Sequence, residues 1–152
     1  MSKWGPLASR YETNRRRNML SLDGGGIRGV LTMEILVEME DQLREALGRG
    51  ADFRLCDFFD YIGGTSTGGI IAAGLARGMS AQELLDFYVR IGPTMFEKTW
   101  LLRRIKNYYE SEPLAEQLRS VFGAGTTLRP DDLRCLLLIV TRNRTTDRRH
   151  SL

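Results

Sequence analysis

The sequence predicts an α/β domain built around a mostly parallel sheet. Apolar runs of strand length alternate with amphipathic runs of helix length, in the order strand, helix, strand, helices, strand. Two glycine-rich turns each join a predicted strand to the helix that follows it. The chain of 152 residues is long enough to bury one core. Because open α/β sheets place their sites at the carboxyl ends of the strands, the two glycine turns are the first candidates for function.

The first part of the chain is expected to hold one strand and one long helix. Residues 1–17 are polar and aperiodic and predict a flexible arm, so the folded domain is expected to span 18–152. Residues 18–22 predict the first strand, and a helix pattern starts at Arg28. Apolar residues four apart predict the face of this helix that packs on the core: Leu31, Ile35, Met39, Leu43 and Leu47.

The middle of the chain predicts a short helical turn, a strand and two helices. The strand is expected over roughly 61–63, and the next helix over 67–77. Ser80 and Glu83 have the spacing of a capping box at the start of the second helix. We expect that helix to bury Leu84, Leu85, Phe87, Tyr88 and Ile91.

The last part of the chain predicts one more helix and one more strand. Pro113 suits the first turn of a helix that ends at Gly123. The run "CLLLIVT" over 135–141 is continuously apolar, which is typical of a strand buried on both faces. Its first residue, Cys135, is expected to be a buried free thiol.

Composition excludes several classes of protein. The net charge of +3 is modest and no nucleic-acid motif occurs, so no nucleic-acid partner is expected. The two cysteines lack metal-ligand spacing, and we expect neither a metal nor a cofactor. No secretory signal and no membrane-spanning run is visible. These features predict a cytoplasmic protein whose membrane contact, if any, is peripheral.

The first glycine turn is "DGGGIRG", residues 23–29. It matches G-x-G-x-x-G, but a dinucleotide site would need an acidic residue that closes a second strand, and the acidic residues at that distance lie within a helix. A nucleotide-binding module is therefore a weak alternative. Successive backbone N–H groups before a helix still form a cradle for a negative charge.

The second glycine turn is "GTSTG", residues 64–68. It matches G-x-S-x-G between a strand and a helix, which is the context of a nucleophile elbow. Such a turn exposes the hydroxyl of Ser66, and small neighbours allow strand and helix to approach each other. The N–H of Thr67 and the helix dipole would then face a developing oxyanion.

A serine nucleophile needs a base, and the lone histidine is a poor candidate. His150 is third from the end of the sequence, in a segment with no structure signal, so it cannot be held in place for a Ser-His-Asp triad. A carboxylate that acts directly on Ser66 is the remaining route, as in a Ser-Asp dyad.

The pair of motifs without a usable histidine resembles the patatin-like phospholipase family, and the similarity covers roughly Met19 to Asp147. The resemblance implies a three-layer α/β/α domain that hydrolyses lipid acyl esters with a Ser-Asp dyad. It implies that Ser66 is the nucleophile and that the oxyanion hole combines Thr67 with the glycine loop, Gly24, Gly25 and Gly26. It also implies loop-shaping or substrate-binding roles for the remaining motif residues, Asp23, Arg28, Gly29, Gly64 and Gly68.

The chain departs from the family at the base. The family's aspartate stands in an Asp-Gly-Gly or Asp-Gly-Ala turn, and none of the aspartates after Ser66 is followed by glycine: Asp86, Asp131, Asp132 and Asp147. We therefore expect a fold that is incomplete at its C-terminus. The alternative to a lipid hydrolase is a catalytically incomplete remnant that binds lipid or a protein partner, with oligomerisation through an exposed sheet edge.

One further stretch mixes aromatic and basic residues. Residues 95–109, "MFEKTWLLRRIKNYY", could lie on an anionic membrane, as would suit a lipase that acts at an interface. A helix that packs one side on the core is the alternative, and we favour it.

Overall fold

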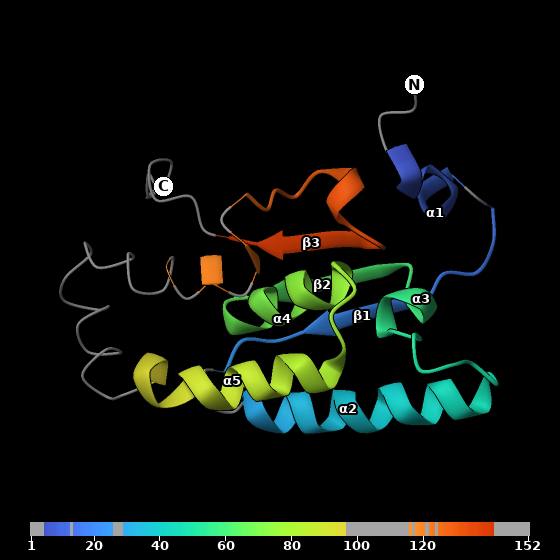
Figure 1. Cartoon of the computed structure of the whole chain (residues 1–152). Helices are drawn as coiled ribbons and strands as arrows, with labels where there is room; N and C mark the ends of the chain where they lie inside the picture. Colours follow the sequence, from blue (N-terminus) through green and yellow to red (C-terminus); the bar gives the residue numbers. More distant parts are fainter. Residues whose placement is uncertain are drawn as a thin grey trace, which may run out of the picture.

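A parallel sheet of three strands forms the centre of the computed structural model (Figure 1). The structure describes residues 5–12, 14–25, 29–96, 116, 118–120, 122, 123 and 125–141. The strand order is β1-β2-β3, and Tyr61 at the start of β2 is level with Met19 on one side and Leu136 on the other. The strands are β1 (Met19–Leu22), β2 (Tyr61–Thr65) and β3 (Leu136–Val140).

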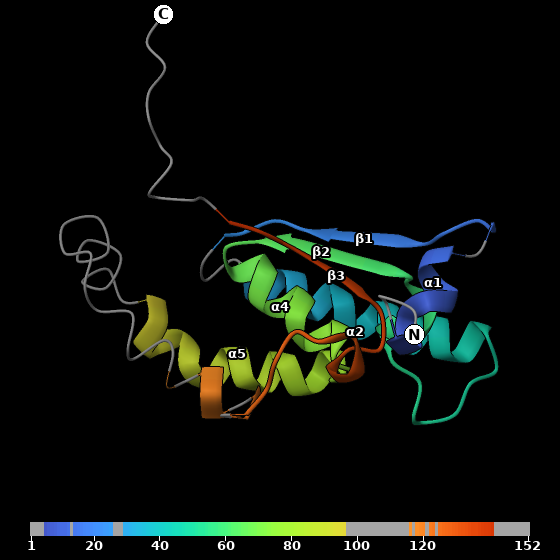
Figure 2. The ribbon, with the colours of Figure 1, turned by 90° about the horizontal axis from the view of Figure 1, so that it is seen from above.

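The main helices lie on one face of this sheet (Figure 2). They bury one apolar core that includes Leu22 and Ile62 of the strands and Leu36, Leu75 and Leu84 of the helices. The α/β class and the parallel sheet are thus confirmed, and the expected third layer does not appear among the described residues. The helices are α2 (Gly29–Ala46), α3 (Leu55–Phe58), α4 (Thr67–Ala76) and α5 (Ala81–Phe96).

The other face of the sheet is apolar and accessible. Gly63 of β2 lies beside Leu138 on this face, whereas Ile139 faces α4. Leu138 is 47% exposed, and Met19 and Val140 are exposed still more. The prediction that β3 is buried on both faces is therefore wrong, because among the described residues β3 lies at the edge of the sheet and no element covers Leu138 and Val140.

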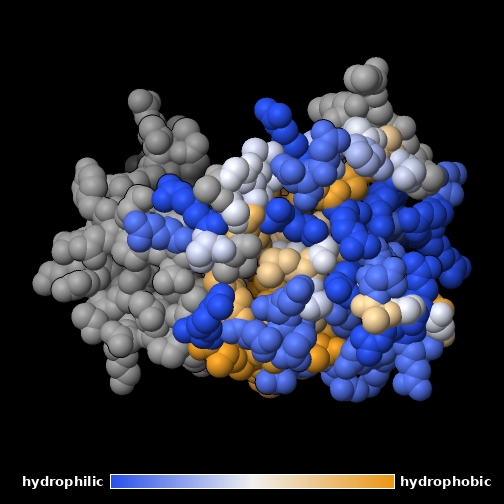
Figure 3. Space-filling view, viewed as in Figure 1, coloured by the Kyte–Doolittle hydropathy of each residue, from blue (hydrophilic) through white to orange (hydrophobic). Residues whose placement is uncertain are grey.

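The buried face of α2 agrees only in part with the one that its sequence predicts. Leu31 and Ile35, which the spacing assigns to the core, are exposed. Figure 3 shows apolar surface along its lower edge, where α2 lies in Figure 1. The fully buried positions are Gly29, Met33, Leu36 and Glu40. Met39 and Leu43 of the predicted face are partly buried and pack against the core, as expected.

Glu40 is the charged member of that buried face. Its carboxylate accepts hydrogen bonds from the N–H groups of Leu55 and Ala81, at 3.1 and 3.2 Å, which belong to the first residues of α3 and α5. Burial raises the pKa of Glu40, and the two backbone hydrogen bonds oppose that rise. A charged residue therefore faces the core because it caps two other helices.

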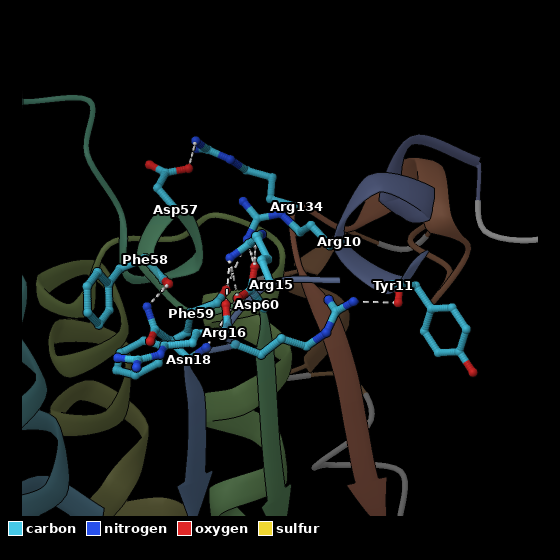
Figure 4. Close-up of polar contacts among 11 residues, drawn as sticks. Arg10, Tyr11, Arg15, Arg16, Asn18, Asp57, Phe58, Phe59, Asp60 and Arg134 are labelled. Atoms are coloured by element: carbon cyan, nitrogen blue, oxygen red, sulfur yellow. Dashed lines mark hydrogen bonds and ion pairs between the residues drawn. The ribbon is translucent and has the colours of Figure 1, made fainter. Parts of the chain in front are cut away.

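The N-terminal segment contains more structure than the predicted flexible arm. A 3₁₀ helix (η1, Gly5–Leu7) runs into α1 (Ala8–Glu12), and Leu7 is buried. Arg15, which follows these helices, pairs with Asp60 through both carboxylate oxygens (Figure 4).

Asp60 is a buried carboxylate at the amino end of β2. It also accepts a hydrogen bond from the N–H of Asn18 at 3.2 Å, and Arg10 lies 3.7 Å away. Its own backbone N–H donates to the carbonyl of Asn18. Asp60 therefore ties the N-terminal segment to the start of β1 and β2.

Two local predictions are confirmed. The N–H of Glu83 donates to Ser80 Oγ at 3.1 Å and the N–H of Ser80 donates to the Glu83 carboxylate at 2.8 Å, which completes the capping box of α5. Cys135 is a buried free thiol, as is Cys56. Burial raises the pKa of Cys56 to about 11 and that of Cys135 to about 12.

Two further predictions fall mainly outside the described residues. Of the helix expected after Pro113, positions 116, 118–120 and 122 are described and helical. The aromatic and basic stretch is described only to Phe96, the end of α5. Within the described part of the chain, no helix is both long enough and apolar enough to cross a bilayer.

Candidate active site

Ser66 occupies the turn between β2 and α4 with an unusual backbone conformation. Its φ is 55° and its ψ is −126°, and among the described residues it is the only non-glycine residue with a positive φ. Positive φ is sterically costly for a residue with a Cβ. Since Ser66 is exposed and directly precedes α4, the turn presents its hydroxyl at the N-terminus of that helix, as a nucleophile elbow does.

The glycines around Ser66 leave no space for side chains. A Cβ placed on Gly64 would lie 2.2 Å from the carbonyl oxygen of Gly68, and one on Gly68 would lie 2.3 Å from the carbonyl oxygen of Leu22. Both neighbours are backbone atoms that cannot rotate away. The glycines that the motif predicts therefore let β1, β2 and α4 pack directly against one another around the serine.

The glycine loop after β1 lies against the same serine. A Cβ on Gly24 would be 2.7 Å from Ser66 Cβ and 3.3 Å from its Oγ. The N–H of Gly25 donates to Thr67 Oγ1 at 3.1 Å. The structure thus brings the two motifs together, and it directs the Gly25 N–H to Thr67.

Tyr88 of α5 is a member of this site that the sequence assigns only to the core. Its ring and its hydroxyl are buried. The same hydroxyl borders Gly29, where an added Cβ would lie only 2.3 Å from the Tyr88 oxygen. Tyr88 thereby accounts for the last glycine of the first motif, a contact between positions too far apart in the sequence for any local pattern to predict.

Of the remaining predicted site residues, the structure describes Asp23 but not Gly26 or Arg28. Asp23 follows β1 and is exposed, and its carbonyl oxygen lies near Gly68. Gly26 and Arg28 fall outside the described residues, as do Asp147 and His150.

No base is paired with Ser66 among the described aspartates that follow it. Asp86 is exposed on α5 and accepts a hydrogen bond from Gln82. Asp131 and Asp132 lie in a 3₁₀ turn (η3, Pro130–Asp132) before β3, and the hydroxyl of Thr127 is bonded to Asp132. Because β3 runs parallel to β2, this turn is at the amino end of the sheet, opposite to Ser66.

A separate cavity of about 310 Å³ lies at the far end of α4. Arg77, Phe122 and Leu128 are among its lining residues, and Ser66 is not. Arg77 follows the last residue of α4, whereas Ser66 precedes the first. The cavity is therefore distinct from the serine site.

Comparison with known proteins places the two motifs in a family. A sequence profile described as patatin-like phospholipase matches residues 20–150. A protein from Vibrio cholerae named cGAMP-activated phospholipase is 40% identical over 93% of this chain. A protein of the same name from Escherichia coli is 40% identical over 74% of it, and Patatin-17 from Solanum cardiophyllum is 38% identical over 69%.

The chain is shorter than these relatives. It spans 42% of the Vibrio cholerae protein, 33% of the Escherichia coli protein and 28% of Patatin-17. The shared region contains both glycine turns and Ser66, and the strand, elbow and helix of the structure are those that the motifs predict. The chain therefore belongs to the patatin-like phospholipase family.

Proposed function

We propose that this chain carries the nucleophile and the oxyanion site of a lipid acyl hydrolase. The observation that carries the proposal is the conformation of Ser66, a strained serine exposed at a strand-to-helix turn with a glycine loop against its side chain. Strain of this kind persists where the surrounding structure enforces it, and such sites are often functional. The substrate class, a fatty-acyl ester, follows from family membership.

In the proposed reaction, Ser66 Oγ attacks the carbonyl carbon of the ester. The hydroxyl proton passes to a base, and negative charge develops on the carbonyl oxygen. The ester C–O bond then breaks, the alcohol leaves with a proton, and an acyl group stays on Ser66. Water hydrolyses this acyl-serine and releases the fatty acid.

The oxyanion site would use backbone N–H groups near the N-terminus of α4. Thr67 is the first residue of α4, so its N–H and the helix dipole face the position next to Ser66. The Gly25 N–H is bonded to Thr67 Oγ1, which gives Gly25 the role of holding the loop in place. We assign the second donor to Gly26, the next residue of the loop, with Gly24 providing the space beside Ser66.

The base is proposed to be an aspartate, as the resemblance implies, from outside the described residues. The described aspartates after Ser66 are bonded elsewhere or lie at the other end of the sheet. Members of a catalytic unit lose most of their effect together, so Ser66 without its aspartate would be slow by several orders of magnitude.

A fluorophosphonate probe tests the nucleophile without requiring turnover. We expect the folded protein to be labelled at Ser66, as located by mass spectrometry of the peptides. Ser66→Ala should not be labelled, and neither should the urea-unfolded protein. Equal labelling of Ser66→Ala and the unsubstituted protein would overturn the proposal.

A second candidate is a non-catalytic module that binds lipid or a protein partner. The uncovered sheet face favours it, because Met19 of β1 and Leu138 and Val140 of β3 expose apolar surface on the strands that flank β2. Self-association through a sheet edge belongs to the same proposal. Hydrolysis of a short-chain p-nitrophenyl ester by the purified chain, abolished in Ser66→Ala, would exclude the purely non-catalytic alternative.

The names of two relatives suggest a regulator to test. Both are called cGAMP-activated phospholipases. We propose that cGAMP be added to the labelling assay, where a higher rate at Ser66 would extend that activation to this chain. Peripheral contact with membranes is likewise a proposal, to be tested by co-sedimentation with anionic vesicles.

A further inference from the structure

The cavity at the far end of α4 combines apolar walls with positive charge. Its volume of about 310 Å³ is at the lower end of the range for small-molecule sites, about 300–1,000 Å³. Two arginines, Arg77 and Arg119, are part of its lining. The apolar part of the lining comes from Ala73, Leu118, Phe122 and Leu128. This size and composition suit a small ligand with one negatively charged end and one apolar end.

Two contacts hold the guanidinium of Arg77 beside the cavity. Its Nη1 donates a hydrogen bond to the carbonyl oxygen of Phe122 at 2.8 Å, and its Cζ lies 5.8 Å from the centre of the Phe122 ring. Thr126 Oγ1 donates to the same carbonyl oxygen, so Thr126 and Phe122 are both tied to the end of α4. The guanidinium is therefore oriented before a ligand arrives, which lowers the entropy cost of binding.

The positive charge of Arg77 is not neutralised by the described part of the chain. No described carboxylate forms an ion pair with it, and the carboxylate of Asp132 is bonded to Thr127 instead. Its Nε is buried and has no hydrogen-bond partner, so neither water nor an acceptor compensates for the charge on that side. An anion bonded to Nη2, the nitrogen that neither bonds Phe122 nor is buried, would supply the opposite charge.

The C-terminus of α4 does not take up this charge either. Positive side chains often bond the free carbonyl groups at the end of a helix. Here the last carbonyl groups of α4 already accept backbone N–H groups: Ala73 from Arg77, Gly74 from Met79, Leu75 from Gly78 and Ala76 from Arg134. The guanidinium of Arg77 is therefore not needed to cap its own helix.

We propose that this cavity is a binding site for an amphiphile with one alkyl chain and an anionic head group, either a fatty acid or a single-chain lipid phosphate. The head group is bonded by Arg77, and the alkyl chain lies against Leu118, Phe122 and Leu128. Leu128 is 59% exposed, so an alkyl chain that covers it removes apolar surface from water. Because Ser66 is at the opposite end of α4, this site goes beyond the proposed function and does not rest on it.

An NMR titration of the full chain with decanoate tests the location of the site. The decanoate is kept below the concentration at which it forms micelles. We expect the largest shifts at the amides of Ala73, Thr126 and Leu128, and none at Gly68 beside the serine. Ser66→Ala should bind decanoate with unchanged affinity. Shifts confined to the surroundings of Ser66, or no shifts at all with either decanoate or decyl phosphate, would overturn the proposal.

Substitutions in the lining test the recognition of charge. Arg77→Gln should weaken decanoate binding by about tenfold to a hundredfold, the loss expected for one charged hydrogen bond. Leu128→Glu leaves the bonds of Arg77 intact and places a negative charge in the lining, so it should weaken binding by about twofold to fivefold. The matched control is Arg129→Gln, an exposed arginine next to Leu128 that is not part of the lining, and its affinity should stay within about twofold.

Four ligands separate the contributions of the head group and the chain. Decanoate and decyl phosphate share the chain, and the tighter of the two identifies the natural head group as a carboxylate or a phosphate. Decanol lacks the charge and inorganic phosphate lacks the chain, so both should bind at least about tenfold more weakly. Equal binding of decanol and decanoate would refute recognition by Arg77, and equal binding of inorganic phosphate and decyl phosphate would refute the apolar part of the site.

The outcomes are independent of the serine chemistry. If Ser66 is not labelled by a fluorophosphonate but decanoate shifts the cavity amides, the proposed function fails and the amphiphile site stands. If Ser66 is labelled and Arg77→Gln and Leu128→Glu, both folded by circular dichroism, bind decanoate as tightly as the unsubstituted protein, the proposed function stands and the amphiphile site is refuted.

Discussion

The two ends of β2 are built on opposite principles. At the amino end, Asp60 is a buried charge whose carboxylate is bonded by Arg15 and Asn18. At the carboxyl end, Ser66 is exposed, has a strained backbone and is surrounded by glycines rather than by polar partners. The amino end uses satisfied polar contacts to hold the N-terminal segment against the starts of β1 and β2, and the carboxyl end uses close backbone packing to hold the proposed nucleophile. The polar contacts and the proposed catalytic group are thus separated by the five residues of one strand.

Substitutions that disturb the close packing at the carboxyl end of β2 should cause the largest loss in the free energy of unfolding. Gly68→Ala places a methyl group 2.3 Å from the carbonyl oxygen of Leu22 and 2.7 Å from that of Asp23. Because both are backbone atoms, we expect a loss of about 3 kcal/mol or more in the free energy of unfolding. Urea unfolding measures it.

The matched control is Gly125→Ala, which has no atom within 4 Å of the added methyl and should change stability by less than about 0.5 kcal/mol. Equal stability of the two variants would show that the backbone around the elbow shifts at little cost to accept the methyl group.

Loss of the charge at the amino end of β2 should lower the free energy of unfolding. Asp60→Asn removes the ion pair with Arg15 and weakens the bonds to the N-terminal segment. We expect about 2 kcal/mol of destabilisation, since the arginines remain partly solvated. Labelling of Ser66 should not change, because Asp60 is at the other end of the strand.

Asp41→Asn serves as the control for Asp60→Asn, because Asp41 is exposed and its ion pair is with Arg44, one turn away on the same helix. A labelling defect in folded Asp60→Asn would contradict the separation of the two ends.

Relief of the backbone strain at Ser66 should raise the free energy of unfolding, by less than the two losses above. Ser66→Gly relieves the positive φ and is expected to stabilise the protein by about 1 kcal/mol relative to Ser66→Ala, after the entropy cost of glycine. Both variants lack the hydroxyl, so the difference between their stabilities measures the free-energy cost of the backbone conformation at this position. Thermal unfolding of the two provides the measurement, and a less stable glycine variant would mean that the elbow is not strained.

The ionisation of the buried thiols should have the smallest effect on stability at neutral pH. Cys56 and Cys135 have pKa values raised to about 11 and about 12, so the unfolded chain releases its thiol protons first. The native state then binds more protons, and stability should fall as the pH rises above about 9 towards the native pKa values. Urea unfolding between pH 7 and 10.5 should show this decline, and Cys135→Ala should reduce its slope.

The elbow could be predicted from the sequence because its causes are local. The residues of "GTSTG" determine both the strand-to-helix turn and the small neighbours that it needs. The capping box of Ser80 and Glu83 was predictable for the same reason, since its two members are three residues apart.

The parts that could not be predicted depend on contacts between distant segments. Glu40 is buried because two helices from elsewhere in the chain direct their N-termini at it, which no spacing within α2 indicates. The exposure of Leu138 depends on the position of β3 in the sheet, and the apolar sequence of β3 does not indicate that position. Tyr88 has the spacing of an ordinary core residue, and only the packing of α5 against α2 reveals its contact with Gly29.

The parallel register of the sheet has a consequence for the order of folding. Tyr61 pairs with Met19 on one side and with Leu136 on the other, so both ladders join segments that are far apart along the chain. Pairings of this kind close large loops and form slowly. By contrast, β2 runs into α4 through a single residue and can collapse as a local unit. We expect the serine turn to be among the first features to form during refolding, and β3, the most distant partner, to be the last strand to join.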